Sequence, residues 1–425
     1  MLPLPAADFA ALAGPDAPVY LDSGATTLKP RRVVERIARF YAEENAPVHR
    51  GVYALSQRAT DLYEDARRTV ARFVSAPAER LVFTRGTTDG LNLVARAWAE
   101  ERLGPGDEIL VSAQEHHSNF LPWQQAARRT GCTFRPMPLT PLGTVDVERT
   151  LGAITQATKL VALAHVSNVL GVENPVRAVF TRAREVGAVC VLDGAQSVPT
   201  RPVDVADLGA DALAWSGHKM MGPTGIGALA LSERLLAEMT LYQTGGGMVD
   251  RVALSGSTFL PTAQRFEAGT PHAAGAIGLA EACDVLAEIG MDRVAAYEAE
   301  WGRRAVAAVR QIDGVRLVGP PGDAEAEGGI VAVQADGAHP LDLAVLLDAQ
   351  GVLCRAGHHC AMPLHDHLGS QHERSGSGGS DAVATSLRAS AYVYNGLGDA
   401  DRFAEALAVA VRTLRGRKRP AVVQP

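Results

Sequence analysis

The chain has 425 residues, of which 47% are hydrophobic and 21% are charged, so it has enough apolar mass for a large core and for more than one domain. Its formal net charge of −6 gives no general electrostatic reason to bind nucleic acid or an anionic membrane. Its 5 cysteines are irregularly spaced and form neither a disulfide framework nor a CxxC metal pair, which predicts reduced thiols and a cytoplasmic protein.

The N-terminal half predicts alternating strands and helices. Its first residues lack the basic region of a signal peptide, and no window holds the roughly 18 uninterrupted apolar residues of a membrane helix. Apolar, β-rich runs predict strands at 107–113, 159–167, 188–195 and 210–217. Helical spacing lies between them at 121–130 and 175–187. This alternation favours a mostly parallel sheet covered by helices on both faces, with ligands beyond the carboxyl ends of its strands.

The pattern changes near residue 290. A long helix is predicted from 291, followed by strands at 314–319 and 328–335, a helix at 339–351 and a final strand–helix pair from 386. We therefore predict an N-terminal arm (1–20) that packs with a small α+β domain (291–425), and a large domain (21–290) between them. The Gly/Ser-rich stretch 370–381 is typical of a mobile loop.

Polar residues follow each predicted strand of the large domain. They are His116, Asn168, Asp193 with Gln196, and Ser216 with His218 and Lys219. An aspartate after a strand is more often a helix cap, and a lysine is usually solvated. However, Lys219 lies in "SGHKMMGPTGIG", among glycine, proline and apolar residues, which is a poor setting for a solvated amine.

Pyridoxal phosphate chemistry uses this whole set. The cofactor needs a lysine for its Schiff base, an aspartate opposite the ring nitrogen and donors for its phosphate. Residues 83–98 supply a strand, a glycine turn, Thr87 and Thr88, and then a helix whose N-terminus favours an anion. Ser216 adds a hydroxyl, and His116 can stack on the ring. The sequence therefore predicts a pyridoxal phosphate site.

The segment "VLCRAGHHCAMPLHDH" (352–367) has three possible interpretations: a metal site, a reactive thiol or a polar loop without function. Consecutive His358, His359 and Cys360 cannot easily share one tetrahedral ion, and no second ligand cluster is evident. A thiolate is the nucleophilic form of cysteine, and Arg355 and the two histidines can supply positive charge that favours it. Gly357 would allow the loop to move. We expect the other cysteines to be structural.

Several motifs together resemble a known family. They are "YLDSGATTLKP" (20–30), "EHHSNFLPWQ" (115–124), "HVSNVLG" (165–171), "DGAQSVP" (193–199), "SGHKMMGPTGIG" (216–227), "FEAGTP" (266–271) and "RAGHHCAMPL" (355–364). The chain resembles the fold-type I, class V aminotransferase-like pyridoxal phosphate enzymes, and within them the SufS-type cysteine desulfurases. The resemblance spans nearly the whole chain and implies a large α/β domain with a smaller α+β domain.

The resemblance also implies roles for individual residues. Lys219 would bind the cofactor covalently, with His116 stacked on the ring, Asp193 at the ring nitrogen, Gln196 and Asn168 near the phenolic oxygen, and Thr88, Ser216 and His218 at the phosphate. Thr270 would reach the phosphate of a neighbouring subunit, and His49 and Arg50 would lie near the active site of the dimer. Arg388 would grip the substrate carboxylate, with Arg355 as a further candidate.

The implied reaction converts L-cysteine to L-alanine. Lys219 would remove the α proton, His116 would exchange a proton, and Cys360 would take the sulfur as a persulfide for iron–sulfur cluster assembly. A homodimer is implied. Leu341 stands where some relatives have a histidine that engages a SufU-type acceptor, which favours a SufE-like one. The alternatives are a selenocysteine lyase and, from another class, a non-catalytic metal or sulfur carrier.

Overall fold

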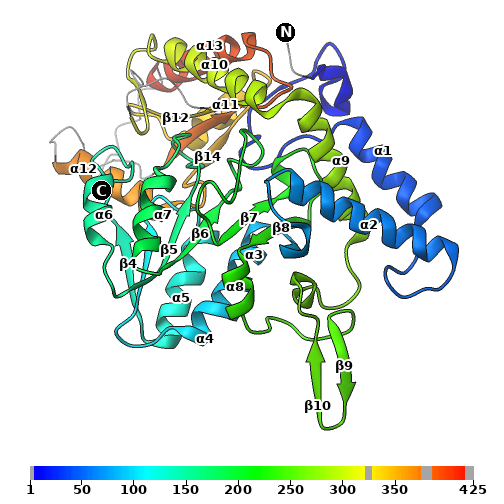
Figure 1. Ribbon diagram of the computed structural model, residues 1–425. Coiled ribbons are helices and arrows are strands. Elements are labelled where there is room, and N and C mark those ends of the chain that lie inside the picture. Colours follow the sequence, from blue (N-terminus) through cyan, green and yellow to red (C-terminus); the bar gives the residue numbers. More distant parts are fainter. Residues whose placement is uncertain (1–3, 321–327, 375–384, 417–425) are drawn as a thin grey trace, which may run out of the picture.

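A seven-stranded sheet forms the centre of the computed structural model, which describes residues 4–320, 328–374 and 385–416 (Figure 1). Its strand order is β2 (Leu81–Thr84), β8 (Gly227–Leu231), β7 (Ala212–Ser216), β6 (Val189–Asp193), β5 (Thr158–Ala164), β3 (Glu108–Ser112) and β4 (Thr133–Met137). Strand β8 runs antiparallel to the other six strands, which are parallel to one another. The predicted mostly parallel sheet is confirmed.

Helices cover both faces of this sheet because its strands are apolar at successive positions. In β5, Leu160 and Ala162 pack into one cluster, whereas Val161 and Leu163 pack into the other, as alternate side chains point to opposite faces. One cluster includes α3 (Thr87–Val94) and α5 (Leu121–Thr130). The other includes α2 (Ala54–Arg72), α7 (Val176–Glu185) and α9 (Ala273–Ile289). Burial on both faces leaves the strand ends as the place for polar groups.

A second, four-stranded sheet forms the C-terminal part of the molecule. Its order is β11 (Val315–Leu317), β12 (Ile330–Ala335), β15 (Ser386–Ser390) and β14 (Arg355–Gly357). Three helices gather with it at the top of Figure 1: α10 (Met291–Val309), α11 (Pro340–Asp348) and α13 (Gly398–Gly416). They enclose a third apolar cluster that includes Trp301 and Phe403.

The N-terminal residues join this C-terminal part. Strand β1 (Val19–Tyr20) pairs in parallel with β13 (Val352–Leu353), and Phe9 packs against Tyr394 with ring centroids 4.7 Å apart. These contacts support an arm at 1–20, and Gly290 between α9 and α10 supports a boundary near 290. The three-part division remains our proposal.

Two further segments extend the fold. The hairpin of β9 (Val249–Ala253) and β10 (Gly256–Phe259) projects away from the body of the molecule (Figure 1). Helix α12 (Met362–Arg374) follows the cysteine segment, and Leu364 and Leu368 pack beside Gly143. The prediction of a loop at 370–381 is therefore wrong for 370–374, which continue this helix; residues 375–381 lie outside the described residues. No helix among the described residues is long and apolar enough to cross a membrane.

Candidate active site

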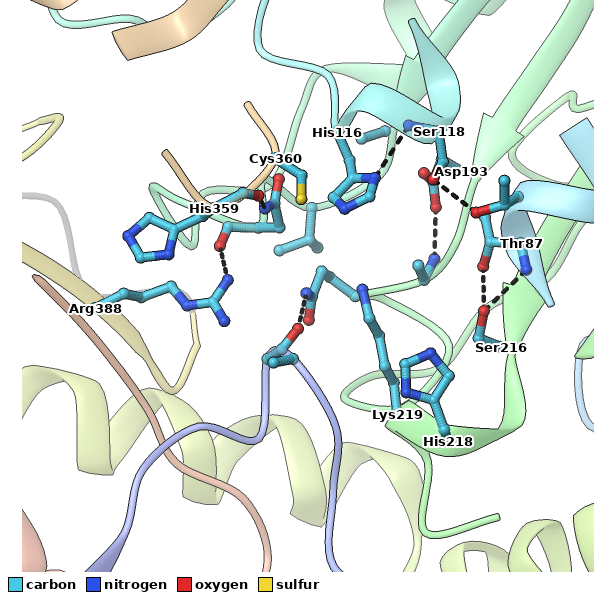
Figure 2. Close-up of a pocket in the computed structure, with 18 of the residues that line it drawn as sticks. Thr87, His116, Ser118, Asp193, Ser216, His218, Lys219, His359, Cys360 and Arg388 are labelled. Atoms are coloured by element: carbon cyan, nitrogen blue, oxygen red, sulfur yellow. Dashed lines mark hydrogen bonds between the residues drawn. The ribbon is translucent and has the colours of Figure 1, made fainter. Parts of the chain in front are cut away.

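A cavity of about 180 Å³ lies where the large sheet meets the C-terminal part (Figure 2). Both parts contribute to its wall. The predicted residues that line it are Thr87, Thr88, His116, Asn168, Asp193, Gln196, Ser216, His218, Lys219, Arg355, Cys360 and Arg388. The other three, His49, Arg50 and Thr270, are not among its lining residues. The cavity thus brings together Lys219 and Cys360, which are 141 positions apart in the sequence.

One end of the cavity offers hydrogen-bond donors. Helix α3 begins at Thr87, and its N-cap residue, Gly86, has no side chain that could cap the first turn. The Thr87 N–H donates to Ser216 Oγ at 2.8 Å, and Thr88 Oγ1 lies 2.7 Å from Ser118 Oγ. A Cβ at Gly86, where φ is 149°, would lie 3.1 Å from Ser216 Oγ. Backbone N–H groups, hydroxyls and the positive end of the helix dipole together suit a phosphate.

Lys219 ends the short 3₁₀ turn η7 (Gly217–Lys219) that follows β7. Burial lowers the pKa of its amine to about 8, and the nearby Asp193 opposes that shift. Hydrogen bonds to the carbonyl oxygen of His218, the residue before Lys219, hold this turn in place. That oxygen accepts the Thr27 N–H at 2.9 Å and the Thr26 and Thr27 hydroxyls at 3.1 Å. The N-terminal segment 20–30 therefore holds a buried amine with a substantial neutral fraction.

Asp193 ends β6, and its carboxyl is buried in the cavity. Burial raises its pKa, while the Ala195 N–H, 2.9 Å from Oδ1, and Lys219 lower it. Gln196, one turn later, donates from Nε2 to Gly24 O at 2.8 Å. A buried carboxyl next to an amine suits a ligand that presents a protonated nitrogen.

His116 is held as a neutral imidazole. Burial lowers its pKa to about 3, and the charge of Lys219 contributes further. The Ser118 N–H donates to its Nδ1 at 3.1 Å, so the proton of the neutral ring is on Nε2. The ring can therefore donate a hydrogen bond from Nε2.

Cys360 reaches the same cavity from the loop between β14 and α12. The backbone is left-handed at His359 (φ 52°) and Cys360 (φ 57°), a conformation that is uncommon outside glycine. Asn168 Nδ2 donates to His359 O at 2.7 Å, and the His117 N–H donates to Cys360 O at 2.7 Å. The predicted movement of this loop about Gly357 is not needed to bring the thiol to the cavity, because these bonds already hold it there.

The charge expected around Cys360 needs one correction. His359 was predicted to supply positive charge, but burial lowers its pKa to about 2 and it is neutral. Lys219 and Arg388 lie close enough to interact with a charge on Cys360. No group of three or more His, Cys, Asp or Glu side chains within 4–320, 328–374 and 385–416 is placed to hold a metal ion.

Two arginines in the wall of the cavity, Arg388 and Arg355, suit a carboxylate. Arg388 is buried and donates to Asn168 O at 2.7 Å and to Asp22 Oδ1 at 3.2 Å. Arg355 lies directly opposite Arg388 in the β14–β15 ladder. Like charges directly opposite each other are destabilising unless an anion lies near them. Asp22 supplies one negative charge beside both arginines, and an amino acid carboxylate would supply a second.

Comparison with known proteins agrees with this geometry. Residues 19–403 match the family model "Aminotransferase class-V". The chain belongs to this family. Over 391 residues it is 44% identical to "Cysteine desulfurase" of Haloferax volcanii, covering 92% of this chain and 88% of that protein.

Solved structures of relatives have the same fold. The cysteine desulfurase CsdA (S-sulfonic acid) from Escherichia coli is 38% identical with a TM-score of 0.86, covering 96% of this chain and 97% of that one. The apo structure of cysteine desulfurase from Thermococcus onnurineus NA1 is 37% identical with a TM-score of 0.86, covering 94% and 95%. The fold-type I architecture expected from the sequence is confirmed.

This class-V family member is a pyridoxal phosphate-dependent enzyme, and its cavity fits the cofactor. Three groups in the cavity match three parts of pyridoxal phosphate. The buried amine of Lys219 suits the aldehyde, the buried carboxyl of Asp193 suits the ring nitrogen, and the start of α3 suits the phosphate.

Three predicted residues lie elsewhere on the chain. Thr270 is exposed. The His49 side chain points to Glu64, with Nε2 3.0 Å from the carboxylate. The Arg50 guanidinium lies against Gly246. The segment before Thr270 is anchored by Glu267, whose carboxylate accepts from buried Arg67 at 2.6 Å. A role for these three residues in the cavity of this same chain is therefore not supported.

Sequence reasoning missed several residues at the site. Asp22 binds Arg388, Ser118 binds both His116 and Thr88, and Gly24 lies against the Arg388 guanidinium. All three occur in motifs that were recognised as family-like. Their roles depend on contacts between segments distant in sequence, which spacing within a motif cannot reveal.

Proposed function

We propose that this enzyme is a cysteine desulfurase that converts L-cysteine to L-alanine and leaves the sulfur as a persulfide on Cys360. The observation that carries the proposal is the shared cavity of Lys219 and Cys360, next to Arg388 and Arg355. The first two residues are the amine and the thiol that the reaction requires, and the arginines suit the carboxylate of an amino acid. The similarity to proteins named cysteine desulfurase supports the same conclusion.

The cofactor, when bound, supplies an electron sink that weakens bonds at the amino acid carbon atoms. Lys219 then takes the α proton, a role that the lowered pKa of its buried amine favours. Asp193 would favour the protonated form of the ring nitrogen, and His116 would donate a hydrogen bond from Nε2. Arg388 orients the substrate carboxylate.

Cys360 collects the sulfur. Its thiolate attacks the substrate Sγ, so that an S–S bond forms as the carbon–sulfur bond breaks, and the electron pair left on carbon takes a proton to give alanine. Lys219 and Arg388 lie close enough to Cys360 to interact with a negative charge on its sulfur. Because the loop backbone is bonded to Asn168 and His117, the thiol is held at the cavity before substrate arrives.

Mass spectrometry of the intact protein after incubation with L-cysteine tests this function. We expect a gain of about 32 Da, one sulfur atom, located on Cys360. The Cys360→Ala variant should keep the cofactor absorption and lose this adduct. A protein without cofactor absorption would instead be a non-catalytic carrier. If Cys360→Ala lost alanine release from cysteine but kept it from selenocysteine, the protein would also have selenocysteine lyase capability.

The finer parts of the proposal concern partners. We propose a homodimer in which Thr270, His49 and Arg50 face the active site of the other subunit, because they are away from the cavity of their own chain. A SufE-like acceptor would receive the sulfur for iron–sulfur cluster assembly, since Leu341 is an exposed apolar residue on α11 and not a metal-ligating histidine. Sedimentation analysis and persulfide transfer to purified acceptors of both types would test these two points.

A further inference from the structure

A buried chain of hydrogen bonds runs behind the cysteine loop. His359, Ser386 and His365 are 5%, 0% and 2% exposed. His359 Nε2 lies 3.1 Å from both the carbonyl oxygen and the hydroxyl of Ser386. His365 Nε2 lies 3.1 Å from the same hydroxyl, and its Nδ1 lies 3.1 Å from Ala361 O. The chain thus starts and ends at the two neighbours of Cys360 in sequence, His359 and Ala361.

The acceptors in this chain determine where the protons are. A carbonyl oxygen only accepts, so His359 carries its proton on Nε2 and His365 carries its proton on Nδ1. The unprotonated Nε2 of His365 is then free to accept the Ser386 hydroxyl proton. Burial lowers the pKa of both rings, which agrees with neutral imidazoles. Each hydrogen bond among His359, Ser386, His365 and Ala361 therefore joins one donor to one acceptor.

This chain links the cysteine loop to the strand that binds substrate. Ser386 and Arg388 are two positions apart on β15, so their side chains share one face of the sheet. His365 lies on α12, and its ring also contacts the rings of His358 and His359, with centroids 5.8 and 5.9 Å away. Strand β15 is thereby in contact with both the proposed carboxylate site and the thiol loop.

The loop needs such support because its backbone is strained. Two consecutive residues other than glycine, His359 and Cys360, have left-handed φ values, and such conformations persist only where the surroundings enforce them. Hydrogen bonds from Asn168 and His117 of the large domain hold the loop on one side. The hydrogen bonds among His359, Ser386 and His365 hold it on the side of β15.

We propose that His365 and Ser386 are positioning residues, which keep the Cys360 thiol directed at the substrate sulfur through His359. This inference rests on the proposed desulfurase function. Because Ser386 and His365, unlike His359, are not among the cavity-lining residues, their substitution should slow sulfur removal and leave cofactor binding and substrate binding unchanged.

Three variants test the proposal against a matched control. His365→Phe keeps a ring of similar shape and removes both nitrogens, Ser386→Ala removes the central hydroxyl, and His365→Gln keeps a polar group near Nε2. The control is His367→Phe, the same substitution two residues later on α12, where Nε2 contacts Thr140 O at 2.8 Å. Single-turnover formation of the Cys360 persulfide, KM for L-cysteine and cofactor absorption are measured for each holoenzyme.

We expect His365→Phe and Ser386→Ala to slow persulfide formation at least about tenfold, since misplacement of about 1 Å can cost 100-fold. KM and cofactor absorption should stay at wild-type values, His365→Gln should recover part of the rate, and His367→Phe should match the wild type. The double variant should be no slower than the slower single variant, because both break one chain. Equal rates in His365→Phe and His367→Phe, or additive losses, would overturn the proposal.

Alkylation of Cys360 by iodoacetamide gives a readout that does not require catalysis. A loop freed from its hydrogen bonds opens more often, so peptide mass spectrometry should show severalfold faster alkylation in His365→Phe and Ser386→Ala. If the wild type formed no persulfide, the desulfurase function would fail on its own. If alkylation rates were the same in the wild type, His365→Phe and Ser386→Ala, the positioning role would fail whatever the function. Should His365→Phe not fold, Ser386→Ala and His365→Gln decide the question.

Discussion

The neutral fraction of Lys219 governs how fast the cofactor can attach, and it can be worked out from the structure. Burial lowers the pKa of the amine from 10.5 to about 8. At pH 7 about 9% of the amine is then neutral, compared with about 0.03% for an unperturbed lysine. Only the neutral amine attacks an aldehyde, so burial should accelerate loading at pH 7 about 300-fold.

The assay follows the return of cofactor absorption near about 420 nm after pyridoxal phosphate is added to stripped protein. Below pH 7 the loading rate should rise almost tenfold per pH unit, and it should level off above about pH 8. Loading with pyridoxal serves as a control, because the cofactor phosphate itself ionises near about pH 6. A rate that kept rising towards pH 10 would refute the lowered pKa of Lys219.

Two variants should shift this profile in opposite directions. The negative charge of Asp193 raises the pKa of Lys219, so Asp193→Asn should move the midpoint to lower pH. The positive charge of Arg388 lowers that pKa, so Arg388→Gln should move the midpoint to higher pH. Midpoints that moved in the same direction would show that these charges do not control the amine.

Three further outcomes are expected. Glu267→Gln removes one of the two carboxylates paired with buried Arg67, leaving Glu64, and should lower the free energy of unfolding by about 3 kcal/mol, measured with urea; an unchanged midpoint would contradict this. Arg388→Lys loses the planar fork and should raise KM for L-cysteine about tenfold, whereas an effect on kcat alone would argue against a carboxylate contact. Gly86→Ala should weaken cofactor affinity in equilibrium titration, because its Cβ would crowd Ser216 Oγ at a φ of 149°; wild-type affinity would show that the turn can adjust.

The sequence predicted those parts of the site that follow directly from strand position. The predicted strand 188–195 is β6 with Asp193 at its end, and 210–217 is β7 with Ser216 at its end. Parallel strands bring their carboxyl ends to one edge, so residues that follow them meet there whatever their separation in sequence. Apolar runs and the residues just after them were therefore sufficient to predict the wall around Lys219.

Charge states could not be predicted in the same way. His359 was expected to be cationic from its position next to Cys360, but it is neutral because Ser386 and β15 bury it. The direct opposition of Arg355 and Arg388 likewise depends on strand register. Burial and register are properties of the folded contacts, which a local motif does not encode.

The N-terminal segment explains why the two halves of the site need no hinge to meet. Asp22 binds Arg388 of the C-terminal sheet, while the Thr27 N–H and hydroxyl bind the carbonyl that precedes Lys219. Gly24, between them, accepts from Gln196 of the large sheet. Because a few consecutive residues bridge both sheets, the separation between the buried amine and the proposed carboxylate site is set by the reach of this short segment. Thr27→Val removes the hydroxyl that donates to His218 O and accepts the Met221 N–H, at a residue that does not line the cavity, and should therefore affect substrate orientation and cofactor attachment together.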